Sequence, residues 1–289
     1  MPIPPILYNI FSFIIAATCA FALSPLCCRV AVTVGAVDVP CDGRRMHTRA
    51  TPRVGGLAVF FAFVVASAIF FSDRQSLVPI LSGGLVIIAA GLLDDVYRIS
   101  PWQKLWLQVV AAAVAVAFGG WNIPVGAAIL WLVLLANAFN LIDGLDGLCS
   151  RVAVFSSFGL LALGGESPLW TLAGAVMGFL PFNLRPARSF LGDTGSLFLG
   201  FSLGVFSLPL VSVRGSGAFL PVLIVFALPL TDTAFAVLRR LAKGRSPFSS
   251  DRGHFHHRLV DHGFTHGEAS LLLSLTALAL SSIGVALGG

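Results

Sequence analysis

Residues 137–148 read Asn-Ala-Phe-Asn-Leu-Ile-Asp-Gly-Leu-Asp-Gly-Leu and end an apolar run that begins at Trp121. The stretch carries two amides and two carboxylates at three-residue intervals, namely Asn137, Asn140, Asp143 and Asp146. On a helix the first three would lie within an arc of about 120°, on one face. The two Asp-Gly steps favour tight turns whose backbone N–H groups can meet a ligand. Because a helix cap needs only one such side chain, four aligned polar groups indicate a functional site.

The composition defines the class of protein around this stretch. Of the 289 residues, 57% are hydrophobic and 11% are charged, which is typical of a polytopic membrane protein. We expect an all-α fold of about ten transmembrane helices, with about nine or eleven as alternatives, forming one transmembrane domain over residues 1–289. The apolar runs lie at 6–28, 54–72, 77–93, 104–119, 121–140, 152–164, 168–182, 195–210, 217–236 and 268–288. No basic residue precedes the first run, so we expect it to be a retained span and not a secretory signal.

The charged residues divide between the two sides of such a bundle. If the connections are numbered from the one after the first run, the odd-numbered connections hold every basic residue except Arg74 and Arg214. All six histidines lie on the same side, and so do the acids except Asp73 and Glu166, with Asp232 near the end of the ninth run and Glu268 at the start of the last. The positive-inside rule makes these five loops cytoplasmic and both termini periplasmic. Because solubility alone would not gather acids beside bases, we expect the five loops to build one cytoplasmic site.

The first two loops each carry a candidate group. Pro52-Arg-Val-Gly-Gly56 predicts a turn that lets the backbone approach a ligand, with Arg53 as a phosphate contact. The alternative for the arginines of this loop is binding to anionic lipid headgroups. In the second loop the adjacent carboxylates Asp94 and Asp95 end an apolar run, and Lys104 follows. These carboxylates repel each other and the helix dipole disfavours both, so they indicate a divalent metal or a phosphate-handling base.

The fourth and fifth loops add oxygen and imidazole groups. Phe190-Leu-Gly-Asp-Thr-Gly-Ser196 begins an apolar run and combines N–H donors, a hydroxyl and the Asp193 carboxylate, which suits phosphate with magnesium. The fifth loop contains His254-Phe-His-His-Arg258. Clustered histidines can bind zinc, but no partner cysteine is present and oxygen groups dominate the other loops. Diphosphate binding by imidazoles beside Arg258 is the interpretation that we favour.

Together these motifs resemble the polyprenyl-phosphate N-acetylhexosamine-1-phosphate transferases, a family of bacterial membrane glycosyltransferases. The resemblance is carried by Pro52–Gly56, Leu93–Asp95, Asn137–Leu148, Phe190–Ser196 and His254–Arg258, in that order along nearly the whole chain. The form of the histidine motif is similar to the sugar-1-phosphate branch and not to the muramyl-pentapeptide branch. One position departs from the family pattern, since Arg98 stands where many members carry a third acid.

The resemblance implies transfer of N-acetylhexosamine-1-phosphate from a UDP-sugar to undecaprenyl phosphate, with release of UMP. It implies magnesium as the cofactor, for which manganese could substitute. The expected partners include membrane lipids and no nucleic acid, and a homodimer is compatible with the resemblance. The product would initiate O-antigen or a related cell-envelope polysaccharide at the inner membrane. The catalytic residues implied are Asp94, which would take the acceptor's proton, Asp95 beside it, and Asp193, which would bind the metal. Nucleotide-sugar contacts would come from Asn137, Asn140, Asp143, Gly144, Leu145, Asp146, Asn183 and Phe190. Phosphate or sugar contacts would come from Arg53, Lys104, His254, His256, His257 and Arg258.

A secondary transporter or ion pathway is the competing interpretation of so many carboxylates in a membrane protein. Transporters place ionisable groups near the bilayer midplane, often in broken helices. Here the acids gather at the ends of the apolar runs, and Asp232 is the exception. A catalytic site is therefore the better explanation.

The charge pattern makes a topological prediction. In a cysteine-free background, a single cysteine at position 193 should be protected from an impermeant thiol reagent in intact cells, because it lies on the cytoplasmic side. A cysteine at position 214 should react. Reaction at position 193 from outside would contradict both the topology and the site.

Overall fold

The computed structural model describes residues 4–39, 50–71, 76–246 and 253–288. Within these ranges the chain forms twelve helices and one two-stranded hairpin. The elements are α1 (Pro5–Thr33), β1 (Val37–Asp38), β2 (Thr51–Pro52), α2 (Gly55–Phe70), α3 (Val78–Tyr97), α4 (Pro101–Gly119), α5 (Val125–Ile142), α6 (Leu148–Ala162), α7 (Pro168–Asn183), α8 (Gly192–Arg214), α9 (Ser216–Val225), α10 (Ala227–Ala242), α11 (Phe255–Asp261) and α12 (His266–Gly288).

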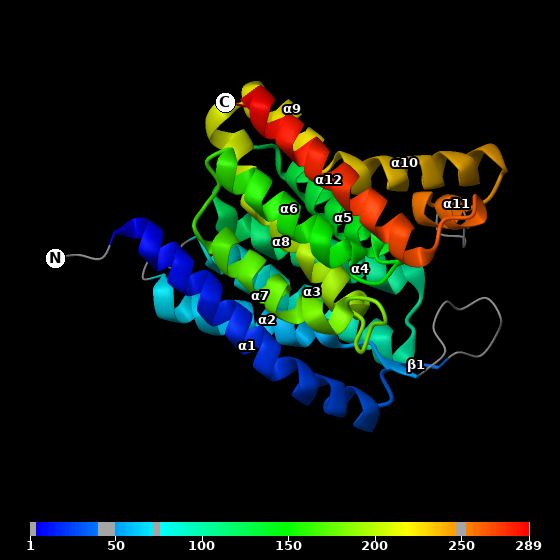
Figure 1. The fold of residues 1–289 in the computed structure, drawn as a ribbon. Helices are drawn as coiled ribbons and strands as arrows, with labels where there is room; N and C mark the ends of the chain where they lie inside the picture. Colours follow the sequence, from blue (N-terminus) through cyan, green and yellow to red (C-terminus); the bar gives the residue numbers. More distant parts are fainter. Residues whose placement is uncertain (1–3, 40–49, 72–75, 247–252, 289) are drawn as a thin grey trace.

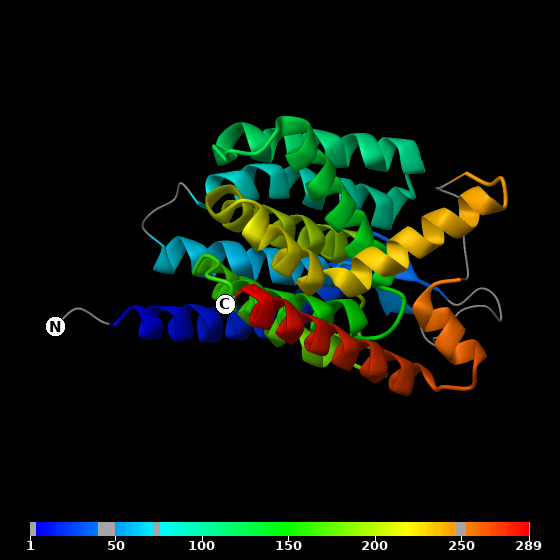
Figure 2. The same cartoon turned by 90° about the horizontal axis from the view of Figure 1, so that it is seen from above.

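From α1 to α8 the helices run side by side as a bundle, with neighbours in the chain pointing in opposite directions (Figure 1). α8 is the central helix: it packs against α2, α3 and α5, and nearly all its residues from Gly192 to Leu208 are buried. Figure 2 shows α4 and α5 along one edge and α1 and α12 along the other. Because α8 is packed on several sides, the surrounding helices hold the first turn of α8 in a fixed place.

Close helix crossings bring α2 and α8 together at one end of the bundle. A Cβ added to Gly56 would lie 2.2 Å from the Gly195 Cα, so neither position has room for a side chain. The sequence pattern predicted that the glycines of Pro52–Gly56 let the backbone approach a ligand. Gly56 instead admits the neighbouring helix, as small residues do at helix contacts in membranes.

The all-α membrane fold is confirmed, but the count of ten spans is not. Six helices are long and apolar enough to cross a membrane: α1, α3, α4, α5, α8 and α12. The bent pair of α9 and α10 brings the number to seven if it is one span, and α2 and α6 are shorter apolar helices. Nine of the ten predicted apolar runs nevertheless fall largely within one helix each, so the order of elements follows the hydropathy pattern.

The prediction of one continuous ninth span over 217–236 is wrong. The helix breaks at Phe226, and α9 and α10 meet at an angle of 77°. Pro229 explains the break, because proline has no N–H to bond the carbonyl of Val225 and its ring collides with that carbonyl. The chain therefore restarts a helix at Ala227, with the proline in the first turn, where it is tolerated.

The motif loops gather at one end of the bundle, where β1 and α11 lie (Figure 1). α1 begins and α12 ends at the opposite end, so both terminal helices have their chain ends on the side away from the motifs. β1 and β2 pair antiparallel, with Val37 opposite Pro52 and Asp38 opposite Thr51. This hairpin places Arg53 at the same end as the start of α8.

Candidate active site

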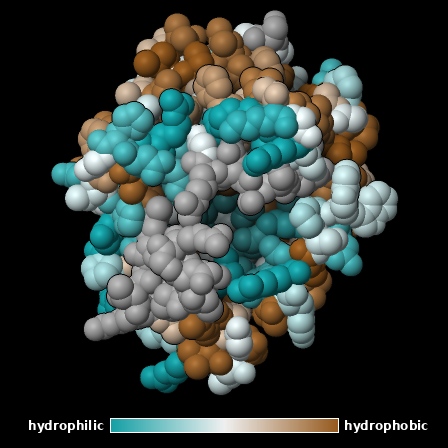
Figure 3. All heavy atoms as spheres, turned by 90° about the vertical axis from the view of Figure 1, so that its right-hand side faces the viewer, coloured by the Kyte–Doolittle hydropathy of each residue, from teal (hydrophilic) through white to brown (hydrophobic). Residues whose placement is uncertain are grey.

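A polar cavity of about 300 Å³ opens at the motif end of the bundle. Figure 3 shows this face, where hydrophilic side chains surround a recess. Four of the five predicted loops line the cavity, which is bounded by Asp38, Arg53, Asn140, Asp143, Gly144, Leu145, Asp146, Asn183, Phe190, Gly192, Asp193, His256 and His257. Residues far apart in the sequence thus converge at one place, as the charge pattern predicted.

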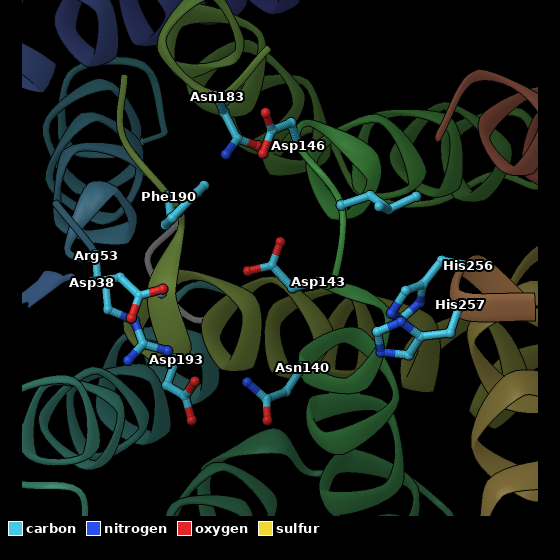
Figure 4. Close-up of a pocket in the computed structure, with 13 residues that line it drawn as sticks. Asp38, Arg53, Asn140, Asp143, Asp146, Asn183, Phe190, Asp193, His256 and His257 are labelled. Atoms are coloured by element: carbon cyan, nitrogen blue, oxygen red, sulfur yellow. The ribbon is translucent and has the colours of Figure 1, made fainter. Parts of the chain in front are cut away.

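Carboxylates and amides face imidazoles across the cavity. Figure 4 shows Asp143 directed into its centre, with Asn140 and Asp193 on one side and His256 and His257 on another. Phe190 lies near Arg53 and Asp38 on the side opposite the histidines. The lining therefore combines oxygen ligands, cationic and neutral donors and one aromatic ring.

A cluster centred on Lys104 lies beside the cavity. It contains the residues of the second loop, Asp94 and Lys104, together with Asp193. The Nζ of Lys104 lies 3.2 Å from Asp94 Oδ2 and donates to Asn140 Oδ1 at 3.1 Å. It also pairs with Asp193 Oδ2. The side chains of Lys104, Asp94 and Asp193 are 16%, 21% and 17% exposed, so all three are partly shielded from solvent. One ammonium between two carboxylates leaves the cluster with one net negative charge when all three are ionised.

Asp95 faces away from this cluster, although it is adjacent to Asp94 in sequence. Consecutive residues on a helix point about 100° apart, so the two carboxylates serve different partners. Asp95 accepts from the backbone N–H groups of Asp193 (3.0 Å) and Thr194 (2.9 Å), and from the Thr194 hydroxyl (2.7 Å). It is buried and lies outside the lining of the cavity. In this structure Asp95 anchors the first turn of α8.

The same bonds correct the role expected for the start of α8. The sequence pattern predicted that Gly192–Ser196 offers free N–H donors to a phosphate. Two of these donors, on Asp193 and Thr194, already bind Asp95. The carboxylate of Asp193 remains directed at the cavity edge, so this motif contributes an acid and not an anion-binding backbone.

Backbone hydrogen bonds join the first and fourth loops. Phe190 N donates to Pro52 O at 2.8 Å, and Gly55 N donates to Phe190 O at 3.0 Å. Gly192 has a φ of +70°, and a Cβ there would lie 1.7 Å from Arg53 O. Only glycine fits this contact, which brings Arg53 beside Asp193.

Asp143 directly follows α5 and occupies the middle of the cavity. Burial raises its pKa to about 8, and the nearby carboxylates of Asp193 and Asp95 raise it further than Arg53 lowers it. An isolated carboxylate would be fully ionised at neutral pH. At neutral pH Asp143 is instead largely protonated, and a bound cation would favour its ionised form.

The histidine motif divides into two roles. His256 and His257 line the cavity from α11, with ring centroids 4.3 Å apart. Burial and the neighbouring His257 lower the pKa of His256 to about 3, so it is neutral at physiological pH. His254 lies outside the lining and binds Asp232 instead, and Arg258 is exposed on the outer side of α11. The phosphate contact expected of Arg258 stays a prediction.

Three further predicted residues support the cavity through contacts with protein. Asn137 binds Gln108 and the carbonyl of Val133, and it lies outside the lining. Asn183 accepts from Ser150 Oγ at 2.8 Å and donates to Ser189 O at 3.1 Å. Asp146 accepts from Ala187 N at 3.1 Å. These bonds hold the ends of α5 and α7 in place. Lys104 also lies outside the lining, and it contacts side chains of the site.

Sequence reasoning left two lining residues out of the site, Asp38 and Gly192. Asp38 lies on a strand of two residues, which is too short to show a periodic pattern. Arg44, Arg45 and Arg49, for which lipid binding was the alternative, lie outside the described residues.

Among the described residues, no three His, Cys, Asp or Glu side chains converge as a ready-made metal site. Magnesium, however, is usually bound by one or two carboxylates together with substrate phosphates and water. Asp143 and Asp193 face the same cavity and supply such oxygen ligands. The residues present therefore fit a cation that arrives with a phosphorylated substrate.

Comparison with known proteins finds relatives that cover most of the chain. A family model described as glycosyl transferase family 4 matches residues 77–211. A probable undecaprenyl-phosphate N-acetylglucosaminyl 1-phosphate transferase of Bacillus subtilis (strain 168) is 34% identical over 96% of this chain and 84% of its own length. The decaprenyl-phosphate N-acetylglucosaminephosphotransferase of Mycolicibacterium smegmatis is 35% identical over 85% of this chain and 74% of its own. The undecaprenyl-phosphate alpha-N-acetylglucosaminyl 1-phosphate transferase of Escherichia coli (strain K12) is 34% identical over 89% and 78%.

These matches define a membrane-bound glycosyl transferase. The chain belongs to the polyprenyl-phosphate N-acetylhexosamine-1-phosphate transferases, and the family resemblance inferred from the five motifs is confirmed.

The different partners of Asp94 and Asp95 give a stability prediction. Asp95→Asn places an amide group against buried N–H donors, and an unsatisfied buried donor costs about 1–3 kcal/mol. We expect this variant to unfold at a clearly lower temperature in detergent. Asp94→Asn should unfold close to the wild-type temperature, because Asp94 is partly exposed and an amide can still accept from Lys104. Equal unfolding temperatures for the two variants would contradict the anchoring role of Asp95.

Proposed function

We propose that this protein transfers N-acetylhexosamine-1-phosphate from a UDP-sugar to undecaprenyl phosphate, releasing UMP. Its membership of the family and the names of its relatives, which act on undecaprenyl or decaprenyl phosphate, support this proposal. The observation that carries it in the structure is the convergence of Asp94, Asp193 and Lys104 beside a cavity with neutral and cationic donors. Such a site suits two phosphorylated substrates, one of which arrives from the bilayer.

The proposed reaction forms one bond and breaks one. An oxygen of the acceptor phosphate attacks the sugar-bearing phosphorus of the UDP-sugar, and the bond from that phosphorus to the bridging oxygen breaks, so UMP leaves. Asp94 is the residue that would take a proton from the acceptor phosphate, since it lies at the partly exposed edge of the lysine cluster. Transfer through a phosphorylated carboxylate is the alternative route, with the same products.

The remaining groups would bind the donor and offset charge. Phe190 would stack on uracil, with Asn183 and Asp146 on the same side of the cavity in Figure 4. His256 and His257 would contact the diphosphate from the opposite wall, and Arg53 would contact it from the side of Phe190. Lys104 would act from behind, by holding Asp94 and Asp193 together.

Magnesium is part of this proposal, with Asp193 as its ligand and Asp143 as a second oxygen donor. When bound, the metal would offset the charge that develops on the leaving phosphate. Manganese, which also prefers oxygen ligands, would substitute.

We further propose that the protein lies in a bacterial inner membrane, with the site on the cytoplasmic side and both termini on the periplasmic side. The charge distribution between the loops supports this orientation. So does the position of the terminal helices, which reach the end of the bundle opposite the site. A lipid-linked sugar made there could serve O-antigen or a related envelope polysaccharide.

Release of UMP by the purified protein tests the proposal. The protein should release UMP only when both undecaprenyl phosphate and a UDP-N-acetylhexosamine are present, and UDP-N-acetylglucosamine should be the best donor of a UDP-sugar panel. Flux of ions or UDP-sugar into protein-containing vesicles, without UMP release, would favour the transporter interpretation instead.

The two carboxylates of the lysine cluster should differ in their effects. Asp193→Asn should lose magnesium-dependent binding of the UDP-sugar together with activity, because the metal ligand is removed. Asp94→Asn should still bind the UDP-sugar with magnesium, but turnover should fall by roughly 10²-fold or more, as for loss of a general base. Calorimetry of both variants, with and without magnesium, measures the difference. If Asp94→Asn abolishes binding while Asp193→Asn retains it, the two roles are exchanged.

A further inference from the structure

The buried carboxylate of Asp232 lies outside the cavity and contacts two residues at the start of α11. Asp232 lies on α10 and is 1% exposed. Its Oδ2 lies 2.8 Å from His254 Nδ1, and its Oδ1 accepts from the backbone N–H of Phe255 at 2.8 Å. One side chain thus holds both the residue before α11 and the first residue of that helix.

These bonds attach α11 to a different part of the fold. α11 has seven residues, too few to be stable alone, and it packs against α12 on one side. α10 leaves the bundle after the bend at Phe226 and lies above α11 (Figure 1). A buried carboxylate is costly unless it is paired, so both bonds of Asp232 favour the position in which α11 is found.

Stacking between histidine rings links the position of His254 to the cavity. The rings of His254 and His256 are stacked, with planes 8° apart and centroids 5.7 Å apart. His256 lies against Gly144, where an added Cβ would be 2.3 Å from Nε2. Gly144 belongs to the turn that contains Asp143 and Asp146. A displacement of His254 would therefore change how His256 and His257 meet the cavity.

We propose that Asp232 is a positioning residue, which holds α11 through His254 and Phe255 so that His256 and His257 face the cavity. For its effect on catalysis this inference rests on the proposed function, in which the two histidines contact the donor diphosphate. For its effect on the fold of α11 it does not. Asp232 reaches neither the cavity nor a substrate, so it acts only through α11.

Chemical labelling tests the structural half without any assay of activity. His254 and His256 are buried, whereas His262 is exposed and gives an internal reference. Diethyl pyrocarbonate should modify His254 and His256 slowly in the wild-type protein, as measured by mass spectrometry. Asp232→Ala should accelerate both at least fivefold relative to His262. Asp232→Asn should stay close to wild type, because an amide can still accept from Phe255 N–H and donate to His254.

Two controls keep this test decisive. Asp261→Ala removes an exposed carboxylate from the same short helix and should change nothing. His254→Ala breaks the contact from the other side and should expose His256 if Asp232→Ala does not fold. Unchanged labelling of His256 in Asp232→Ala, or in His254→Ala where the first variant is unfolded, would overturn the proposal. Equal acceleration in Asp232→Asn and Asp232→Ala would overturn it as well.

Kinetics test whether the position matters for catalysis. A displacement of about 1 Å can cost roughly 10²-fold in rate, so Asp232→Ala should lose about that factor in kcat/KM. Asp232→Asn should recover most of the loss. In a chain that already carries His256→Ala and His257→Ala, Asp232→Ala should have little further effect, because interacting residues are not additive. A full additional loss in that background would show that Asp232 acts on stability alone.

The two proposals fail in different ways. If the wild-type protein releases no UMP from any UDP-sugar, the proposed function fails, and labelling still decides the role of Asp232. If the wild-type protein is active and Asp232→Ala is as active as Asp261→Ala, the positioning role fails and the proposed function stands.

Discussion

The shared ammonium of Lys104 is the interaction on which the site depends. Asp94 ends α3 and Asp193 begins α8, and both carboxylates lie at the end of an apolar bundle where an unpaired charge is costly. Lys104, from α4, meets both and also binds Asn140 of α5. Four helices are thereby tied at one point by charge and hydrogen bonding. The net charge that remains is negative, which suits a site that must accept a cation together with phosphate.

Neighbouring residues divide structural and chemical tasks in this site. Asp95 uses both oxygens to hold the first turn of α8, so Asp94 is left for the lysine cluster. Asn140 points to the cluster, whereas Asn137, about one turn earlier, binds Gln108 of α4. His254 binds Asp232, while His256 and His257 line the cavity. In each motif, therefore, some polar residues hold the others in place.

Hydropathy and charge predicted much of this arrangement. Nine of the ten apolar runs fall largely within one helix each. Four of the five loops that were assigned to one side by their charges line one cavity, with Asp143, Phe190, Asp193 and His256 among the lining residues. The partners of individual side chains could not be predicted, because they depend on rotation about each helix axis. For that reason Asp95 and Lys104 were expected to touch substrate. The break at Phe226 did have a sequence signal, Pro229, but the continuous apolar run obscured it.

The bend between α9 and α10 sets the direction in which α10 runs, and therefore the position of Asp232. Phe226 is fully buried at the bend, with ring centroids 6.1 Å from Trp131 and 6.2 Å from Phe139, both on α5. Asp232 lies six residues further on, about 9 Å along the helix, so a rotation of about 6° at the bend moves it by about 1 Å. The accuracy with which the histidines are placed is thus set by aromatic packing one helix away from the chemistry.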